Sequence, residues 1–571
     1  MKVFELLLRD IKTTPKAFYP VISFAVVSGL SNAFLIATIN SAVETVAIND
    51  PNWQYLFKYL LCLFLFFHTR RYMLDRSIEI VESVVSQIRL RLVDKVRLTE
   101  LVTLEKYGSA TIYARITQDA TIVSNSSRNI INGVQQSILI IFILFYIATI
   151  SLWSFGFVIL GLITGMFYYI GLSNNFQAMW KRVSEEETAF FSKLAHLLQG
   201  FNEISINRRK NEDVFETYVT VNDKISDYRI KTIKRYNITL IFLQVFFYIL
   251  LGLILFALPR FHAEHSEHII KIVAAILFMV GPMDGVIYSV PTLANANNSA
   301  HNIMELESQL KEELKKMREQ RIDPYSPDAY RSLPFQSGIS LKGLSYQYPQ
   351  SNGYGTGFQV GPIDLTIRKG ELIFVTGGNG SGKSTFLKLF TGLYKPDAGQ
   401  IRLDEEKDYP GKEVNMLNYQ QYQNLFSIIF SDYHLFDKIY GVEREIDPDE
   451  VKALLASMEL PEEKTTYIDG AFTNINLSSG QKKRLALTTA LLEDKPIYIF
   501  DEVAADLDPE FRDKFYFEIL KELKARNKTI LVVSHDQQYW SVSDRLIRFQ
   551  DGMMWELSKV EVRSLVEKVL K

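Results

Sequence analysis

The first half of the chain alternates long apolar stretches with long charged ones. Six apolar stretches lie before residue 300, and four of them contain no Asp, Glu, Lys or Arg. A helix needs roughly 20 apolar residues to cross about 30 Å of hydrocarbon, so stretches of this length predict transmembrane helices. We therefore expect a transmembrane domain over residues 1–318, with six spans at about 17–40, 54–70, 135–153, 155–172, 238–259 and 268–290.

The connections after the second and fourth spans are far longer than ordinary loops. Their apolar residues recur at helical spacing, as at Ile78, Val81 and Val85, so we expect the second to fifth spans to continue as helices beyond the membrane. These extensions should turn near 106–108 and 200–203. Both connections are rich in Lys and Arg, which predicts that they lie in the cytoplasm with both termini.

Two polar features of this half are candidate functional groups. Asp284 in the sixth span would cost roughly 2.5–3.5 kcal/mol at membrane depth, so it should either line a substrate path or bond a neighbouring helix. The outer loop before that span contains His262, His265 and His268. Imidazoles suit transition metals, but an ordinary polar loop is the favoured interpretation of these residues.

The second half has the composition of a soluble domain. A charged, Pro-containing linker is expected over 319–336, and from 337 to 571 β-branched runs alternate with helical patterns. That alternation predicts an α/β domain with a largely parallel sheet. The net charge of −2 gives no indication of a nucleic-acid partner. The single cysteine, Cys62, excludes intrachain disulfides and cysteine-rich metal sites.

A phosphate-binding loop is the most informative motif in this second half. It fits G-x-x-x-x-G-K-[ST], and it stands between an apolar run, 372–375, and a segment with helical periodicity. Glycines let backbone N–H groups close around phosphates, and the helix that follows adds its positive N-terminal end. Lys383 can reach the β- and γ-phosphates, and Ser384 can bind Mg²⁺. The nucleotide-binding candidates are Gly377, Gly378, Asn379, Gly380, Ser381, Gly382, Lys383, Ser384 and Thr385.

Three further candidates follow predicted strands and suit hydrolysis of a nucleotide. Asp501 ends an apolar run and can orient Mg²⁺ directly or through water. Glu502 is next, where a carboxylate can polarise an attacking water. His535 also follows an apolar run and can contact a γ-phosphate. We therefore assign catalytic roles to Glu502, His535 and Lys383.

Two binding elements complete the series. Tyr348 is placed to stack on adenine, although a strand aromatic can also serve packing alone. A second Ser- and Gly-containing segment begins an apolar-periodic helix, where hydroxyls and backbone amides can hold a γ-phosphate. Its candidate residues are Ser478, Ser479, Gly480 and Gln481.

Seven such elements in this order resemble the ABC transporter superfamily, over nearly the whole chain. The resemblance implies a P-loop ATP-binding cassette with Walker A at 377–385, the signature at 477–481, a D-loop at 505–508 and the ligands ATP and Mg²⁺. It also implies a homodimer, because each ATP is clamped between the loop of one copy and the signature of the other. Ser431 stands where the superfamily usually has glutamine, which leaves open whether Ser431 or Asp432 serves the metal.

Finer detail resembles the exporters of cyclic peptides and pyoverdine-type siderophores, through segments 430–436, 501–509 and 200–204. This implies an ATP-driven exporter of a cyclic or nonribosomal peptide, such as a siderophore precursor. It would work by alternating access in the cell membrane, most simply a bacterial inner membrane. The expected partners are a second copy, membrane lipids and a peptide-like substrate. A lipid or glycan flippase, or an ATP-gated channel or regulatory subunit, are the alternatives.

Overall fold

The structure is a computed structural model that describes residues 2–3, 5–6, 18–47, 53–257, 269–319, 330–348, 357–405, 411–442 and 444–570. It divides into two compact units, Met1–Arg97 with Gly108–Gln309, and Leu98–Tyr107 with Leu310–Lys571. Most of the predicted linker and the histidines at 262, 265 and 268 lie outside the described residues.

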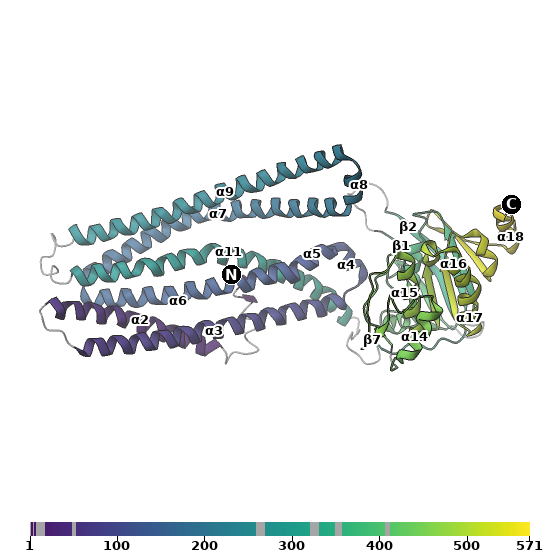
Figure 1. The fold of residues 1–571 in the computed structure, drawn as a ribbon, viewed down its shortest axis with the longest axis horizontal. Helices are drawn as coiled ribbons and strands as arrows, with labels where there is room; N and C mark the ends of the chain where they lie inside the picture. Colours follow the sequence, from purple (N-terminus) through teal and green to yellow (C-terminus); the bar gives the residue numbers. More distant parts are fainter. Residues whose placement is uncertain are drawn as a thin grey trace. The chain divides into compact units, whose positions relative to one another are not determined.

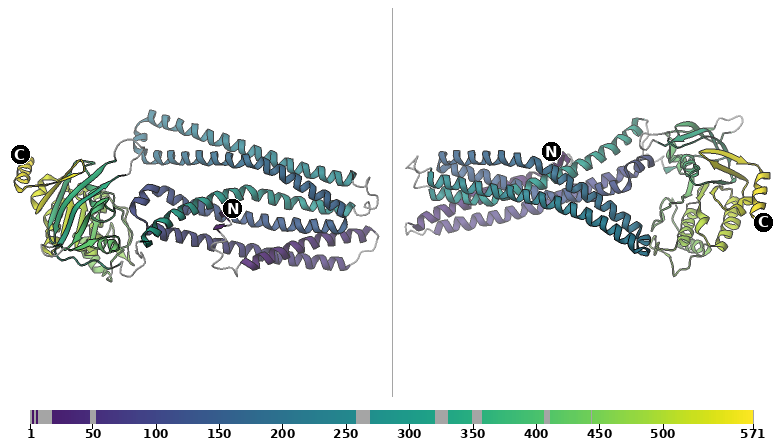
Figure 2. Two further views of the ribbon diagram at one scale, coloured as in Figure 1. Left: turned by 180° about the vertical axis from the view of Figure 1, so that it is seen from behind. Right: turned by 90° about the horizontal axis from the view of Figure 1, so that it is seen from above.

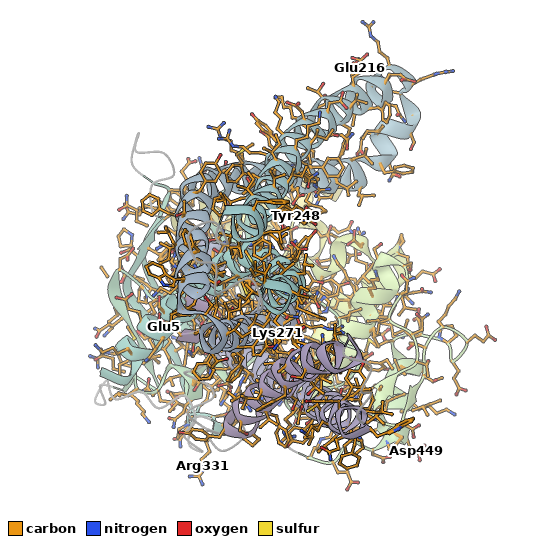
Figure 3. The ribbon with its side chains drawn as sticks, turned by 90° about the vertical axis from the view of Figure 1, so that its left-hand side faces the viewer. Glu5, Glu216, Tyr248, Lys271, Arg331 and Asp449 are labelled. Atoms are coloured by element: carbon orange, nitrogen blue, oxygen red, sulfur yellow. The ribbon has the colours of Figure 1, made fainter. Side chains whose placement is uncertain are left out.

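The first unit is a bundle of long helices (Figures 1 and 2). Helices α7 and α9 run side by side. Figure 3 shows Glu216 on the part of this α7–α9 hairpin that stands away from the remaining helices. The elements are α2 (Phe18–Ala47), α3 (Trp53–Arg97), α5 (Ser109–Ala114), a π-helical turn (Arg115–Asp119), α6 (Ala120–Ile150), α7 (Leu152–Gln199), α8 (Phe201–Ile206), α9 (Arg208–Gly252), a second π-helical turn (Leu253–Ala257) and α11 (Ile269–Glu319).

Membrane-spanning character is clear for four helical segments, among the described residues. Tyr19–Val43, Thr111–Ile150, Arg208–Phe256 and Ile269–Glu312 are long and apolar enough to cross a bilayer. The predicted spans 54–70 and 155–172 lie within α3 and α7, and the apolar part of α7 is the shorter segment Leu152–Tyr168. Several helices of the first unit thus have the length and composition of membrane spans, and the number six stays a prediction.

Helices α3, α7 and α9 continue well past their apolar parts, as the helical spacing of the charged connections predicts. The predicted turns fall where one helix ends and the next begins. Gly108 separates α4 (Leu101–Tyr107) from α5 with φ +75°, and Gly200 separates α7 from α8. A positive φ is costly for residues with a Cβ, which explains glycine at position 108.

The turn between the third and fourth predicted spans was misplaced by the hydropathy pattern. The prediction puts it at 153–155, whereas α6 ends at Ile150 and α7 begins at Leu152. Ser151 is extended and its side chain accepts a hydrogen bond from the Ser154 amide at 3.3 Å. A serine N-cap satisfies an orphan amide at the helix start, so the local break occurs there rather than at Trp153.

The second unit is an α/β domain with two principal sheets. One sheet has the order β12–β11–β3–β10–β9–β6; all its neighbouring pairs are parallel except β11 with β12. The largely parallel sheet is therefore confirmed. The other is antiparallel, β2–β1–β4–β5. The strands are β1 (Gly338–Gln347), β2 (Gln359–Arg368), β3 (Leu372–Gly377), β4 (Ala398–Leu403), β5 (Lys412–Val414), β6 (Phe426–Ile429), β7 (Tyr467–Ile468), β8 (Ala471–Phe472), β9 (Ile497–Asp501), β10 (Thr529–Val533), β11 (Arg545–Gln550) and β12 (Met553–Leu557).

Helices surround these sheets, and two apolar clusters on the sheets form the core. Strands β3, β9 and β10 are buried on both faces, as expected for central parallel strands. Their carboxyl ends therefore lie along one edge of the sheet, where loops can carry function. The helices are α12 (Lys383–Phe390), α13 (Tyr419–Gln423), α14 (Pro448–Ser457), α15 (Ser479–Glu493), α16 (Pro509–Lys514), α17 (Leu520–Ala525) and α18 (Lys559–Leu570), with short 3-10 or π turns at Val503–Asp506, Phe515–Ile519 and Gln537–Val542.

Candidate nucleotide-binding site

The predicted phosphate loop joins the buried strand β3 to α12. Gly377 has φ +151°, and a Cβ there would lie 2.3 Å from the carbonyl oxygen of Phe549. Gly382 has φ +106° and precedes α12 without any side-chain cap on the helix amides. Glycine is thus required at both ends of the loop, and the first amides of α12 remain available to an anion.

The loop contains polar groups that suit phosphate. Lys383 is 7% exposed, and its Nζ donates to the carbonyl oxygens of Gly377 at 2.9 Å and Gly378 at 3.1 Å. The Ser381 hydroxyl is buried without a hydrogen-bond partner among the described residues. Asn379 and Gly380 are exposed at the loop tip. An uncapped helix start, a buried orphan hydroxyl and an ammonium folded onto the loop fit the phosphates of a nucleotide.

Tyr348 lies at the end of β1 and contacts this loop directly. Its hydroxyl is 3.1 Å from Oγ1 of Thr385, and its ring meets that of Tyr394 edge-on at 6.0 Å between centroids. The partly buried ring is therefore held beside the phosphate loop by contacts on two sides. This position is compatible with stacking on a base.

Asp501 and Ser431 come together at the ends of β9 and β6. Asp501 is 2% exposed, and burial followed by the nearby Glu502 charge raises the pKa of its carboxyl. Ser431 donates hydrogen bonds to it through its backbone amide and its hydroxyl, which lower that pKa. Ser384 is exposed at the start of α12, and Asp432 is exposed as well. Within the described ranges, Ser431 is thus the residue of this pair that reaches the carboxylate.

These oxygens make a reasonable but incomplete donor set for Mg²⁺. Carboxylate and hydroxyl oxygens are hard donors, which this ion prefers. The described residues contain no group of three or more His, Cys, Asp or Glu side chains that could hold a metal. Mg²⁺ is commonly held by one or two carboxylates together with substrate phosphates, so Asp501, Ser384 and Ser431 fit a metal that arrives with nucleotide.

The two predicted catalytic groups after the strands lie next to each other. Nε2 of His535 is 3.3 Å from Oε1 of Glu502, and both side chains are partly exposed. Glu502 adopts a left-handed conformation with φ +53°, and its amide donates to the carbonyl of Val533 at 3.1 Å. A non-glycine residue in this conformation is uncommon and often marks a functional position. The carboxylate and the imidazole could therefore act on the same water.

Sequence reasoning missed Lys483, which bonds the backbone carbonyl of Glu502. Lys483 is 5% exposed, and its Nζ donates to the carbonyl oxygen of Glu502 at 2.7 Å and to Asp506 at 2.9 Å. The signal available was a lysine within an otherwise apolar face of the helix that starts at the signature segment. A buried ammonium group is normally paired with an acceptor, so this pattern indicates that Lys483 has a partner but not which residue that partner is.

The signature segment lies at the start of α15. Ser478 is the N-cap, and it forms a capping box in which its side chain accepts from the Gln481 amide and Gln481 bonds back to the Ser478 amide. Ser479 is exposed. A Cβ added to Gly480 would lie 2.9 Å from the carbonyl oxygen of Asp506, so glycine permits a close approach of the two backbones. No hydrogen bond or ion pair of the described residues joins this segment to the phosphate loop.

A second feature not predicted in detail is the anchoring of α4. This short helix belongs to the second compact unit. Glu105 accepts hydrogen bonds from the Tyr394 hydroxyl at 2.5 Å and from Lys388 at 2.9 Å. Leu101 and Val102 pack against the apolar core of the unit, and Lys395 pairs with Glu100. The anchor is thus both polar and apolar.

Comparison with known proteins agrees with this arrangement. Residues 360–505 match the family model described as ABC transporter. The "ATP-binding protein SyrD" of Pseudomonas syringae pv. syringae is 32% identical over 483 residues, which cover 82% of each chain. An "ATP-dependent lipid A-core flippase" of Thiobacillus denitrificans is 30% identical over 34% of each chain. The "Structure of a bacterial Atm1-family ABC exporter with ATP bound" has the same fold over 99% of each chain, with a TM-score of 0.76 and 14% identity.

Proposed function

Because the chain belongs to the exporter-type ABC transporters, which couple ATP hydrolysis to transport across a membrane, we propose that it works as a homodimer that exports a cyclic or nonribosomal peptide. A siderophore precursor is one such peptide. The observation that carries the dimer is the incomplete site in one chain. Tyr348 contacts the phosphate loop, and the charge of Lys383 in that loop acts on Asp501, which precedes Glu502. The signature segment itself makes no polar contact with the phosphate loop among the described residues.

A second copy related by twofold symmetry would complete two equal sites. In that arrangement the exposed Ser479 and the amides at the start of α15 meet the γ-phosphate bound to the other chain's loop. Helix α8 gives further support, because Phe201 is 58% exposed and Ile206 is 88% exposed at the tip of the α7–α9 hairpin. Apolar side chains exposed on so short a helix favour burial against a partner.

The residues of the site divide the chemistry of hydrolysis among them. Lys383 and the loop amides bind the phosphates, and the side chain of Tyr348 stacks on the base. Glu502 accepts a proton from the attacking water, and His535, at 3.3 Å, orients that carboxylate and the γ-phosphate. Ser384 and Asp501, with Ser431 beside them, would hold Mg²⁺, which would supply positive charge near the phosphate oxygens.

Transport follows from the difference in nucleotide affinity between two arrangements of the dimer. ATP binds the closed pair of cassettes better than the open pair, so its binding shifts the population toward closure. The membrane helices then exchange a cavity open to the cytoplasm for one open to the outside, and hydrolysis resets the cycle. With both termini on the cytoplasmic side of a bacterial inner membrane, this direction of movement is export.

The test is ATPase activity of the protein in nanodiscs across a panel of cyclic peptides, siderophores and lipids. We expect stimulation by peptides and none in Glu502→Gln, which controls for contaminating ATPases. Sizing of the reconstituted protein by mass photometry should give two copies. A monomer with full ATPase activity would contradict the proposal.

A lipid flippase is the second candidate, because one relative over a third of the chain carries the name of a lipid A-core flippase. The discriminating assay uses proteoliposomes that contain a fluorescent phospholipid. ATP-dependent loss of dithionite-accessible fluorescence, without stimulation by any peptide, would favour the flippase.

A further inference from the structure

A polar pocket lies among the apolar helices of the first unit. It has a volume of about 370 Å³ and is lined by α2, α3, α6 and α11. That volume falls within the rough range of 300–1,000 Å³ for ligand pockets. Phe66, Leu139 and Phe278 form apolar parts of the wall. The polar lining side chains are Ser28, Asn32, Arg70, Gln135 and Gln136.

Gln135 provides the strongest indication of a ligand. It is 5% exposed, and its Nε2 donates to the Ser28 hydroxyl at 3.3 Å. Its Oε1 is buried and has no hydrogen-bond partner among the described residues, although it belongs to a side chain that lines the pocket. A buried acceptor left unpaired is costly, and more so at membrane depth, where water is scarce. The atom therefore calls for an N–H or O–H donor from a molecule in the pocket.

Arg70 gives the pocket a positive charge. Its guanidinium lies 5.4 Å from the ring centroid of Phe66, which also lines the pocket. The neighbouring Arg71 pairs with Asp75 at 3.6 Å, whereas Arg70 has no such carboxylate partner among the described residues. No Asp or Glu lines the pocket either. A guanidinium next to an apolar wall is suited to an anionic group, best a planar carboxylate.

We propose that this pocket is a subsite for the transported molecule, and that it binds an apolar peptide through a backbone N–H to Gln135 and a carboxylate to Arg70. This rests on the proposed export function and adds the chemistry by which the substrate is recognised. An anionic lipid headgroup shares the negative charge. The hydroxyls of a phosphatidylglycerol headgroup can also donate to Gln135, so the lipid is tested as a competitor; the peptide is the occupant that the proposed export function favours.

The test measures binding to the full-length dimer in phosphatidylcholine nanodiscs without nucleotide. Three probes are dansyl-labelled tetrapeptides of alternating Ala and Leu: one with a free carboxylate, one with a carboxamide, and one with a carboxylate but N-methylated backbone amides. We expect the free carboxylate to bind roughly tenfold more tightly than either of the others, the effect of losing one hydrogen bond to a charged or buried group.

Matched variants assign each preference to its residue. Arg70→Gln should remove the preference for carboxylate over carboxamide, Arg70→Lys should retain most of it, and Arg71→Gln should leave it at the wild-type value. Gln135→Leu should remove the preference for free amides over N-methylated ones. Gln244→Leu is its control, because Gln244 bonds Asp284 and does not line the pocket.

Several results would overturn the subsite. These are equal affinity of all three probes, full discrimination in Arg70→Gln, or displacement of the peptide by 30% phosphatidylglycerol with the same dependence on Arg70. The last would assign the pocket to lipid. Peptide-stimulated ATPase activity that is unchanged in the Arg70 and Gln135 variants would contradict the subsite but support the exporter. Probe binding that depends on both residues, without any stimulation of ATPase activity, would support the subsite and contradict the peptide exporter.

Discussion

The contact of Tyr394 with Glu105 yields a prediction whose size follows from the structure. Tyr394 is 1% exposed, and its hydroxyl lies 2.5 Å from Oε2 of Glu105 on α4. Burial raises the pKa of Glu105, but the hydrogen bonds from Tyr394 and Lys388 outweigh it, so the pKa lies below its ordinary value. A carboxyl with a lowered pKa stabilises the folded state when the pH is above the ordinary pKa of the group. This stabilisation is lost only as the pH falls through the lowered pKa of the folded state. Glu105 is therefore ionised at neutral pH, and its bond with Tyr394 is a hydrogen bond to a charged carboxylate.

Tyr394→Phe removes this hydroxyl while it keeps the ring and its packing. A hydrogen bond to a charged group contributes roughly 1.5–3 kcal/mol, and the 43% exposure of Glu105 favours the lower limit. A loss of about 1.5 kcal/mol corresponds to an approximately tenfold increase in the local opening of α4. Lys388 still holds Glu105 at 2.9 Å, so complete release is not expected.

Hydrogen exchange followed by mass spectrometry measures this opening directly. At neutral pH, amides of the α4 peptide should exchange about tenfold faster in Tyr394→Phe than in wild type. Amides of the central strand β3 should be unchanged, because it makes no contact with Glu105. The expected change is thus local.

Tyr422→Phe is the matched control. Tyr422 is also fully buried, and its hydroxyl donates to the Phe390 carbonyl at 2.6 Å, but it does not contact Glu105. This variant should lower the stability of the unit without selective exposure of α4. Equal exchange of α4 in Tyr394→Phe and wild type, or equal exposure in both variants, would refute the reasoning.

Three further predictions concern the nucleotide site. Glu502→Gln should retain ATP binding but lower the hydrolysis rate by roughly 10²-fold or more and trap a closed dimer, which single-turnover assays and retained nucleotide would reveal. Lys383→Ala should weaken ATP binding by about 10- to 100-fold in calorimetry, and unchanged affinity would refute its role. Ser431→Ala removes the hydroxyl hydrogen bond that helps to lower the pKa of Asp501, while the hydrogen bond from the backbone amide remains. Protons then compete with metal at higher pH, so the acid limb of the ATPase profile should move upward; an unmoved limb would contradict this.

Much of the nucleotide site could be predicted because phosphate chemistry restricts residue type and spacing. Gly377 and Gly382 need conformations or close contacts that a Cβ would prevent, and their spacing to Lys383 is readable from the chain. The largely parallel sheet was predictable for a similar reason, since buried parallel strands leave continuous β-branched runs. A structural feature can thus be predicted from local sequence rules when a single short segment of the chain forms it.

The remaining features depend on contacts between distant segments. Lys483 bonds to the Glu502 carbonyl across 19 positions, and Glu105 meets Tyr394 across 289. The pocket around Gln135 depends on how four helices are rotated, which hydropathy does not determine. Even the turn at Ser151 was misplaced, because one N-cap hydrogen bond decides it within an apolar sequence that permits a helix on either side.

Glu502 shows how the two kinds of information combine. Its residue type and its place after β9 follow from the chain, but its left-handed backbone does not, because glutamate gains nothing from a positive φ. The conformation is held by the Val533 carbonyl on one side and by Lys483 on the other. Lys483 lies on α15, which starts at the signature segment. In the proposed homodimer, the signature segment of each chain contacts one ATP and its Glu502 carboxylate acts on the other ATP. Within each chain, the bond between Lys483 and the Glu502 carbonyl therefore joins the elements that serve the two ATP molecules.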